Sequence, residues 1–150
     1  MKTFTCNIFI NSSAEKLWEA LTSPDLIRQY WNGFTMRSQW EPGAPIALFK
    51  PDGTRNWEGK ILAYEPYSLL AYTFDPSVDA NYPEESVSKV SWKISPSMGV
   101  MMLTIIHEEL TDQFEAHVSF GWSYFMSSIK SLLETGKPLP QLNMRNNESS

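Results

Sequence analysis

The residues best suited to chemistry are the two histidines and the carboxylates that lie between them. In chain order these are His107, Glu108, Glu109, Asp112, Glu115 and His117. An imidazole that titrates near neutrality can act as a general acid or base beside a carboxylate, or can orient the polar end of a ligand. The alternatives are a hydrogen-bonded core histidine at position 107 and a solvated turn for the carboxylates. The sequence leaves both interpretations open.

Several other kinds of site are excluded by spacing. A metal site that joined His107 to His117 would require the intervening chain to fold back, and the spacing is not that of metal ligands. The chain has no glycine-rich phosphate loop, and no serine lies in a nucleophile-elbow pattern. Its single cysteine, Cys6, excludes an internal disulfide. We therefore predict no metal and no cofactor, and leave enzymatic activity undecided.

Aromatic residues are abundant, with 6 Trp, 6 Tyr and 8 Phe in 150 residues. Large rings fill cores, and they also line ligand pockets. The predicted ligand-binding residues are Trp31, Phe34, Trp57, Tyr72, Phe74, Trp92, His107, Phe120, Trp122 and Tyr124. The alternative is that these rings only fill the interior. Trp31 and Phe34 are the better candidates, since they lie in the turn between predicted helices and strands.

The N-terminal part of the chain predicts one strand and two short helices. Apolar residues alternate with polar ones over residues 3–10, as in a half-buried strand. Ser12 and Glu15 form a candidate capping box for a helix over residues 14–21. A second short helix begins at Pro24 and reaches Tyr30.

The middle of the chain predicts an antiparallel meander of short strands separated by turn residues. The expected strands cover residues 35–40, 45–49, 56–64, 68–74, 86–94 and 100–108. Residues 75–85 carry two prolines and four carboxylates between the fourth and fifth of these strands. That composition predicts a mobile loop at one end of the sheet.

The last predicted element is a helix over residues 115–135. Its apolar positions recur at steps of three and four, in a stripe of Val118, Trp122, Phe125, Ile129 and Leu132. Gly136 and Pro138 end it. A sheet that buries its apolar face against one such helix has to bend around it, and the misfit can leave a cavity. Residues 1–138 form the predicted domain, and residues 139–150 are expected to be a flexible polar tail.

Composition limits the partners. The net charge is −5 and no cluster of Lys and Arg is present, so we expect no nucleic-acid partner. No stretch reaches the ~20 apolar residues of a membrane span. The first residues lack the apolar run of a signal peptide, so we expect a cytoplasmic protein.

A set of short segments, in order and spacing, resembles one known family. The segments are residues 8–22, Tyr30-Trp31, residues 57–61 with Glu65-Pro66, Ser91-Trp92, Leu103-Thr104, Gly121-Trp122 and residues 133–136. The chain resembles the activator of heat-shock protein 90 ATPase homologue-like group of the START-like, or SRPBCC, superfamily. The resemblance implies an α+β helix-grip fold, in which a curved antiparallel sheet of about six to seven strands wraps around a long C-terminal helix. Two short helices follow its first strand.

The resemblance also implies a ligand cavity between sheet and long helix, but it does not fix one activity. Members of the superfamily include lipid carriers, cyclase-like proteins, hormone receptors and chaperone activators. We therefore expect an apolar small-molecule ligand. A cyclase or hydrolase that uses the cavity, and a co-chaperone that stimulates a heat-shock protein 90 type ATPase, are the alternatives. A homodimer is compatible with all three.

Overall fold

The computed structural model describes residues 1–142, which form seven strands, three α-helices and one 3-10 turn. In chain order the elements are β1 (Lys2–Ile10), α1 (Ala14–Thr22), α2 (Pro24–Tyr30), β2 (Thr35–Ser38), β3 (Pro45–Phe49), β4 (Arg55–Glu65), β5 (Leu69–Phe74), η1 (Pro76–Val78), β6 (Ser88–Ser97), β7 (Val100–Leu110) and α3 (Asp112–Thr135). Among these residues no helix has both the length and the apolar character needed to cross a membrane.

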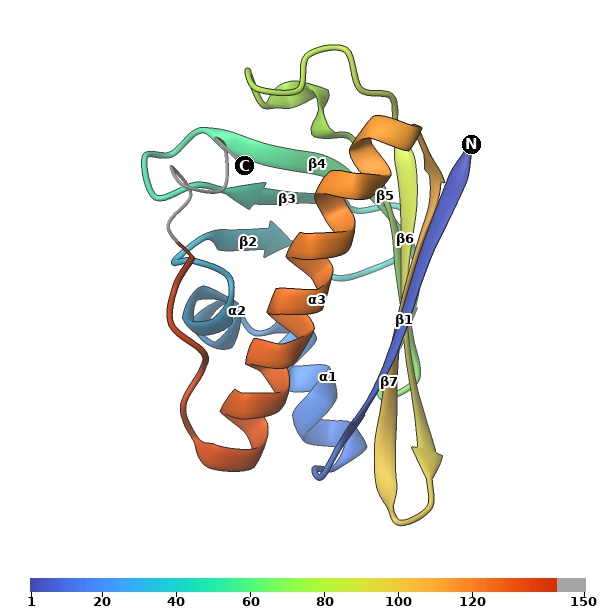
Figure 1. Cartoon of the computed structure of the whole chain (residues 1–150), viewed down its shortest axis with the longest axis vertical. Helices are drawn as coiled ribbons and strands as arrows, with labels where there is room; N and C mark the ends of the chain where they lie inside the picture. Colours follow the sequence, from blue (N-terminus) through green and yellow to red (C-terminus); the bar gives the residue numbers. More distant parts are fainter. Residues whose placement is uncertain (143–150) are drawn as a thin grey trace.

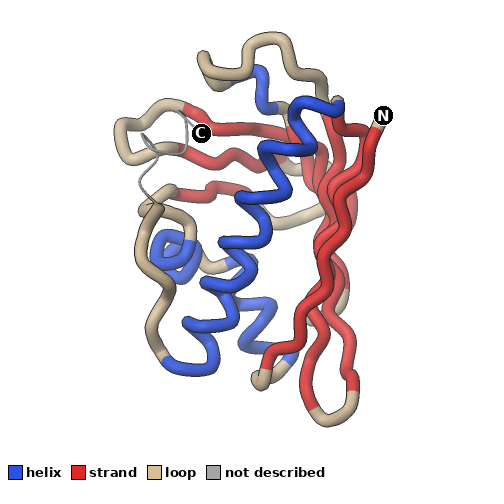
Figure 2. Tube along the Cα trace, in the orientation of Figure 1, coloured by secondary structure: helices blue, strands red, loops and turns tan. Residues whose placement is uncertain are grey.

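The strands form one antiparallel sheet in the order β1-β7-β6-β5-β4-β3-β2. The sheet is strongly bent: β2, β3 and β4 run across the view of Figure 1, whereas β1, β6 and β7 run along its long axis. Helix α3 crosses in front of this bend, and α1 and α2 lie at its C-terminal end (Figure 2). The predicted α+β helix-grip fold is confirmed.

The apolar stripe of α3 lies on the concave side of the sheet, as its period predicted. Val118, Trp122, Phe125, Ile129 and Leu132 are all buried. They join a single core cluster with residues of the sheet and of both short helices. The helix ends at Gly136, whose positive φ of 83° places it in the left-handed region that glycine adopts without a steric penalty.

Helix α3 begins at Asp112, three residues before the predicted start. Thr111 is its N-cap, and the hydroxyl of Thr111 accepts a hydrogen bond from the backbone N–H of Phe114 at 3.1 Å. Asp112 and Glu115 lie in the first turn, where the helix dipole stabilises negative charge. Part of the carboxylate run therefore belongs to a helix start rather than to a turn.

The predicted capping box of α1 is wrong. Ser13, not Ser12, is the N-cap, and its hydroxyl accepts from the backbone N–H of Lys16 at 3.2 Å. The hydroxyl of Ser12 is buried without a hydrogen-bond partner in the described part of the chain. Two adjacent serines offered the same signal, and only the backbone conformation of the helix start distinguishes them.

The strand bounds differ most from the predicted ones at the β6–β7 hairpin. The predicted strand 86–94 is in fact Ser88–Ser97, so the turn is shorter than expected. Met98 and Gly99 form it with φ values of 52° and 86°, while Ser97 pairs with Val100. Two central residues with positive φ suit the right-handed twist of a hairpin. At β2 the predicted strand 35–40 ends instead at Ser38.

The edge strand β1 is tied to α3 near its end. The ammonium group of Lys130 donates to the backbone carbonyl of Phe9 at 2.6 Å. The carboxylate of Glu134 accepts from the backbone N–H of Asn11 at 2.7 Å, and it also pairs with Lys130 at 2.8 Å. One ion pair on the helix therefore binds two backbone groups of the sheet edge.

The chain after α3 folds back along that helix. The backbone N–H of Leu139 donates to the hydroxyl of Ser128 at 3.0 Å, and the hydroxyl of Tyr124 donates to the carbonyl of Pro140. The N–H of Leu142 donates to the side-chain oxygen of Asn32 at 2.8 Å. Of the predicted tail, residues 139–142 are thus hydrogen-bonded to the domain, and residues 143–150 lie outside the described part.

Candidate functional site

A pocket of about 220 Å³ opens between α3, the β5–β6 loop and the turn that joins α2 to β2. Seven phenylalanine and tryptophan side chains line it: Trp31, Phe34, Phe74, Phe114, Phe120, Trp122 and Phe125. Aliphatic contacts come from Val118 on the helix and from Leu142 of the chain that folds back. The lining joins residues of α3 to residues of β4 and β5 and of the loops beside them.

Five of the residues predicted to bind a ligand line this pocket, namely Trp31, Phe34, Phe74, Phe120 and Trp122. Four of these are almost completely buried. Phe120 is the exception, with 56% of its surface exposed at the pocket mouth. The two residues of the α2–β2 turn that seemed the better candidates, Trp31 and Phe34, are both in the set.

The other five predicted residues do not line the pocket. Trp57, Tyr72, Trp92 and His107 are buried in the core behind it. Tyr124 lies further along α3, where its hydroxyl binds the returning chain. A ligand contact by any of these five stays a prediction. In the structure Trp57, Trp92 and His107 pack against rings of the pocket wall.

The rings behind the pocket pack into a continuous stack. Trp57 lies nearly parallel to Tyr72, with ring centroids 5.0 Å apart, and its centroid is 4.7 Å from that of Phe74. On the pocket side, Trp31 contacts Trp122 edge to face at 5.3 Å and Phe125 at 5.0 Å. Interlocked aromatic pairs of this kind hold one another in fixed orientations. The pocket wall is therefore formed before any ligand arrives.

His107 forms the polar centre of this core, and both of its ring nitrogens have partners. Nε2 lies 2.8 Å from the hydroxyl of Ser88, and that hydroxyl donates to the carbonyl of Phe74 at 3.1 Å. Nδ1 accepts from the indole N–H of Trp122 at 3.0 Å. Because an indole can only donate, Nδ1 is unprotonated and Nε2 carries the proton.

The environment keeps this imidazole neutral. His107 has no exposed surface, and burial lowers its pKa to about 3. No carboxylate of residues 1–142 is hydrogen-bonded to it; the predicted acidic partners lie at the end of β7 and in the first turn of α3. Within residues 1–142 no group of three or more His, Cys, Asp or Glu side chains could hold a metal ion. His107 is therefore a satisfied core histidine and not an accessible acid or base.

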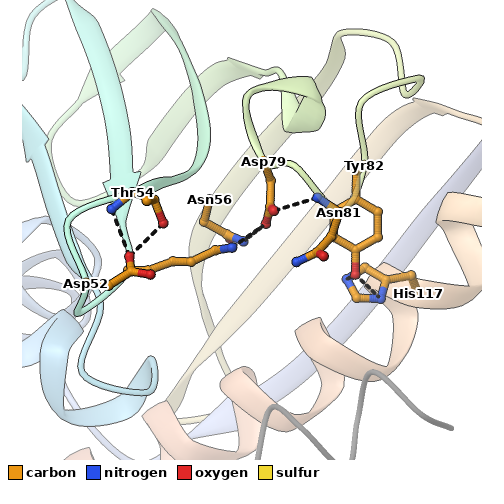
Figure 3. A network of polar contacts seen from close by, with 8 residues as sticks. Asp52, Thr54, Asn56, Asp79, Asn81, Tyr82 and His117 are labelled. Atoms are coloured by element: carbon orange, nitrogen blue, oxygen red, sulfur yellow. Dashed lines mark hydrogen bonds and ion pairs between the residues drawn. The ribbon is translucent and has the colours of Figure 1, made fainter.

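A second polar cluster borders the pocket and links the β3–β4 hairpin to the β5–β6 loop (Figure 3). Asp79 is only 2% exposed, and its carboxylate is 3.0 Å from the ammonium group of Lys50. The same carboxylate accepts from the side-chain amide of Asn56 at 3.2 Å and from the backbone N–H of Asn81 at 2.9 Å. These bonds fix the loop against the sheet.

The same loop also reaches α3. The hydroxyl of Tyr82 lies 3.1 Å from Nε2 and 3.3 Å from Nδ1 of His117 (Figure 3). The imidazole stacks on the ring of Phe114, with centroids 5.4 Å apart. Displacement of water lowers the pKa of His117, and the negative charges of Asp79 and Glu85 oppose this effect. His117 is thus a largely neutral polar group in the pocket wall.

Sequence reasoning missed the polar half of the pocket: Asn32, Asn56, Tyr82 and His117. His117 was considered beside the neighbouring carboxylates and as a metal ligand, and not as a residue of the pocket wall. One signal could have found it, because Phe114, His117, Val118 and Gly121 lie on one face of a helix that begins at Asp112. No local pattern indicates Asn56 or Tyr82, which only the folded chain brings beside α3.

The comparisons with known proteins agree with this architecture. The profile of the family described as activator of Hsp90 ATPase homolog 1-like protein matches residues 11–134. A search among curated proteins found no match.

Three solved structures illustrate the similarity of fold. The Aha1 dimer from Colwellia psychrerythraea is 24% identical, with 91% of this chain and 99% of that chain covered and a TM-score of 0.72. For CalU16 from Micromonospora echinospora the identity is 20%, the coverage 98% and 82%, and the TM-score 0.76. MLL2253 from Mesorhizobium loti is 23% identical, with 89% of this chain and 97% of that chain covered and a TM-score of 0.74. At these identities the likeness extends to the fold alone.

Proposed function

Since this chain belongs to the activator of Hsp90 ATPase homolog 1-like family, we propose that it binds an apolar small molecule in the pocket between α3 and the β5–β6 loop. The observation that carries the proposal is the pocket wall itself. Seven Phe and Trp side chains and the ring of Tyr82 line a volume of about 220 Å³. Apolar pockets with a few polar groups are the usual form of small-molecule sites.

Affinity would come from the transfer of apolar ligand surface out of water, at about 25 cal/mol for each Å² buried. The wall needs little ordering on binding, because Trp31, Trp122 and Phe125 already hold one another. A wall that is ordered in advance lowers the entropic cost of binding.

The geometry favours binding over catalysis. A cyclase or hydrolase that used His107 would need that ring to exchange protons with a substrate. Both ring nitrogens are instead engaged by Ser88 and Trp122, and the ring lies behind the pocket wall.

The test is titration with N-phenyl-1-naphthylamine, an uncharged probe whose fluorescence rises in apolar surroundings. We expect saturable binding by the wild-type protein and at least about tenfold weaker binding by Gly121→Leu, whose new side chain would occupy the pocket. A Cβ at Gly121 meets only the Phe125 ring, at 3.8 Å, so this variant has room to fold.

Ser123→Leu is the matched control, since Ser123 is exposed on the same helix and does not line the pocket. It should bind the probe like the wild type. No saturable binding by the wild type, or equal binding by Gly121→Leu, would contradict the proposal.

A chaperone-cofactor role is the second candidate, and it is supported by the family description alone. The test is the rate of ATP hydrolysis by an Hsp90 at saturating concentrations of this protein, and an unchanged rate would exclude the role. A homodimer is a separate proposal, prompted by the dimeric relative from Colwellia psychrerythraea. Sedimentation equilibrium would show whether the chain self-associates.

A further inference from the structure

We propose that the pocket selects an uncharged aromatic ligand with a hydroxyl group and discriminates against the carboxylate analogue of the same ring system. This inference rests on the proposed function, and it adds the charge and the polar group of the ligand. Three observations support it: the side chains that line the pocket, the polar groups at its border and the charges around it.

None of the described residues that line the pocket is Asp, Glu, Lys or Arg. A carboxylate moved from water into an aromatic pocket loses its hydration, and it regains stability only if a cation or several donors replace the water. Within residues 1–142 the lining offers no cation. Contact with the wall therefore contributes favourable binding free energy for the ring system of a ligand, but not for an attached carboxylate.

The polar groups in the lining suit a hydroxyl. Asn56 uses one amide N–H on Asp79, which leaves its carbonyl oxygen and a second N–H. The imidazole of His117 already contacts the hydroxyl of Tyr82, which leaves one ring nitrogen as a donor or an acceptor for a ligand. Asn56 and His117 together offer a ligand both donors and acceptors. A hydroxyl can use both kinds of partner, because it donates one hydrogen bond and accepts others. A carboxylate can only accept.

Within residues 1–142, the charged groups in contact with the polar border of the pocket are acidic or already paired. Asp79 and Glu85 both act on His117 through their negative charge. The ammonium group of Lys50 is paired with the carboxylate of Asp79 at 3.0 Å. The hydroxyl of Thr111 donates to Glu85 without neutralising it. An anionic ligand would approach this side of the pocket against unfavourable electrostatics.

The first experiment compares 2-naphthol with 2-naphthoate by isothermal titration calorimetry at about pH 7.5, where the phenol is neutral and the acid ionised. We expect 2-naphthol to bind at least about fivefold more tightly. A smaller difference, a preference for 2-naphthoate, or no binding of 2-naphthol overturns the inference. If N-phenyl-1-naphthylamine still binds, the proposed function survives that result; if it does not, both fail.

The second experiment adds a cation at the pocket mouth. Phe120 is exposed at the mouth, so Phe120→Lys and its uncharged control Phe120→Gln should both fold. We expect 2-naphthoate to bind Phe120→Lys at least about threefold more tightly than Phe120→Gln, with 2-naphthol equal in the two. This gain should vanish at about 1 M salt, where charges are screened. An unchanged affinity for 2-naphthoate overturns the inference.

Discussion

The indole N–H of Trp122 donates to Nδ1 of His107 over 3.0 Å, so a ring that lines the pocket fixes the protonation of a ring behind it. Trp122, His107, Ser88 and Phe74 form a series of hydrogen bonds, and the groups at its two ends determine which atom donates in each bond. Trp122 can only donate, and the proton of Ser88 goes to the carbonyl of Phe74. Strand β7 and helix α3 are thereby joined by a hydrogen bond that requires one tautomer and no charge on the imidazole.

The first prediction concerns pH. Because the pKa of His107 is about 3 in the folded protein and near 6.5 when unfolded, the unfolded chain binds more protons between these values. The contribution of neutral His107 to the free energy of unfolding is fully present above about pH 6.5. As the pH falls from there to about 3, the free energy of unfolding decreases by about 1.4 kcal/mol per pH unit. Urea unfolding of the wild type and His107→Gln between about pH 7.5 and 4.5 measures this loss.

The His107→Gln variant should show a flatter dependence on pH than the wild type, because its amide does not titrate. His117→Gln is the control, since His117 is accessible and the charges of Asp79 and Glu85 oppose the lowering of its pKa. It should change the slope less. Identical slopes for the wild type and His107→Gln would show that His107 titrates normally.

The second prediction concerns Trp122→Phe, which removes the donor to Nδ1 and leaves a buried acceptor unpaired. We expect a loss of about 1–3 kcal/mol for that acceptor, in addition to any loss of packing. A double-mutant cycle with His107→Leu separates the two contributions. A coupling energy of about 1 kcal/mol or more is expected from denaturant unfolding. Additivity within about 0.3 kcal/mol would mean that the hydrogen bond contributes nothing.

The third prediction concerns the ion pair that holds the β5–β6 loop. Asp79→Ala removes the counter-charge of Lys50 and the acceptor for Asn56 and Asn81. Because the carboxylate is buried, we expect a loss of about 2–4 kcal/mol in the free energy of unfolding. Glu58→Gln is the control, since its pair with Arg55 is exposed and should contribute less than about 1 kcal/mol. Equal effects of the two variants would contradict this account.

The fourth prediction compares two glycines. A Cβ at Gly59 would lie 1.8 Å from the backbone carbonyl oxygen of Thr73, so Gly59→Ala has to push β4 away from β5. We expect a lower thermal midpoint and a loss of about 2 kcal/mol or more. Gly121→Ala, in the interior of α3 with space around it, should instead stabilise the protein by up to about 1 kcal/mol. If both substitutions changed the free energy of unfolding in the same direction, the close contact between Gly59 and Thr73 would be refuted.

The sequence predicted the long helix well because its signal is local and periodic. The stripe from Val118 to Leu132 depends only on spacing within one element, and all five of its residues are buried. The start of that helix was missed because Thr111 and Asp112 follow a run of carboxylates that resembles a turn. The cap of α1 was misplaced because Ser12 and Ser13 are adjacent and equally suitable by type.

The polar side of the pocket could not be predicted in the same way. Tyr82 and His117 are 35 residues apart, and their contact exists only because the β5–β6 loop folds over α3. Asn56 and Asp79 are brought together by the same loop across 23 residues. Residue type alone found five of the seven Phe and Trp side chains of the wall and missed Phe114 and Phe125. It identifies rings suited to a pocket but not which of them face it. Trp57 and Trp31 are equally aromatic, yet only Trp31 lines the pocket.

The Lys130–Glu134 pair binds the backbone of Phe9 and Asn11, and this contact affects how readily the sheet edge can pair with another chain. A sheet that ends in a nine-residue strand is a template for strand addition, the first step toward fibrils. The pair occupies the carbonyl of Phe9 in this strand and the N–H of Asn11 just after it, and it places two side chains of α3 beside the edge. Lys130→Met should therefore shorten the lag time of amyloid formation under agitation more than it lowers the melting temperature. We therefore expect helix α3 to hinder strand addition at β1 in addition to lining the pocket.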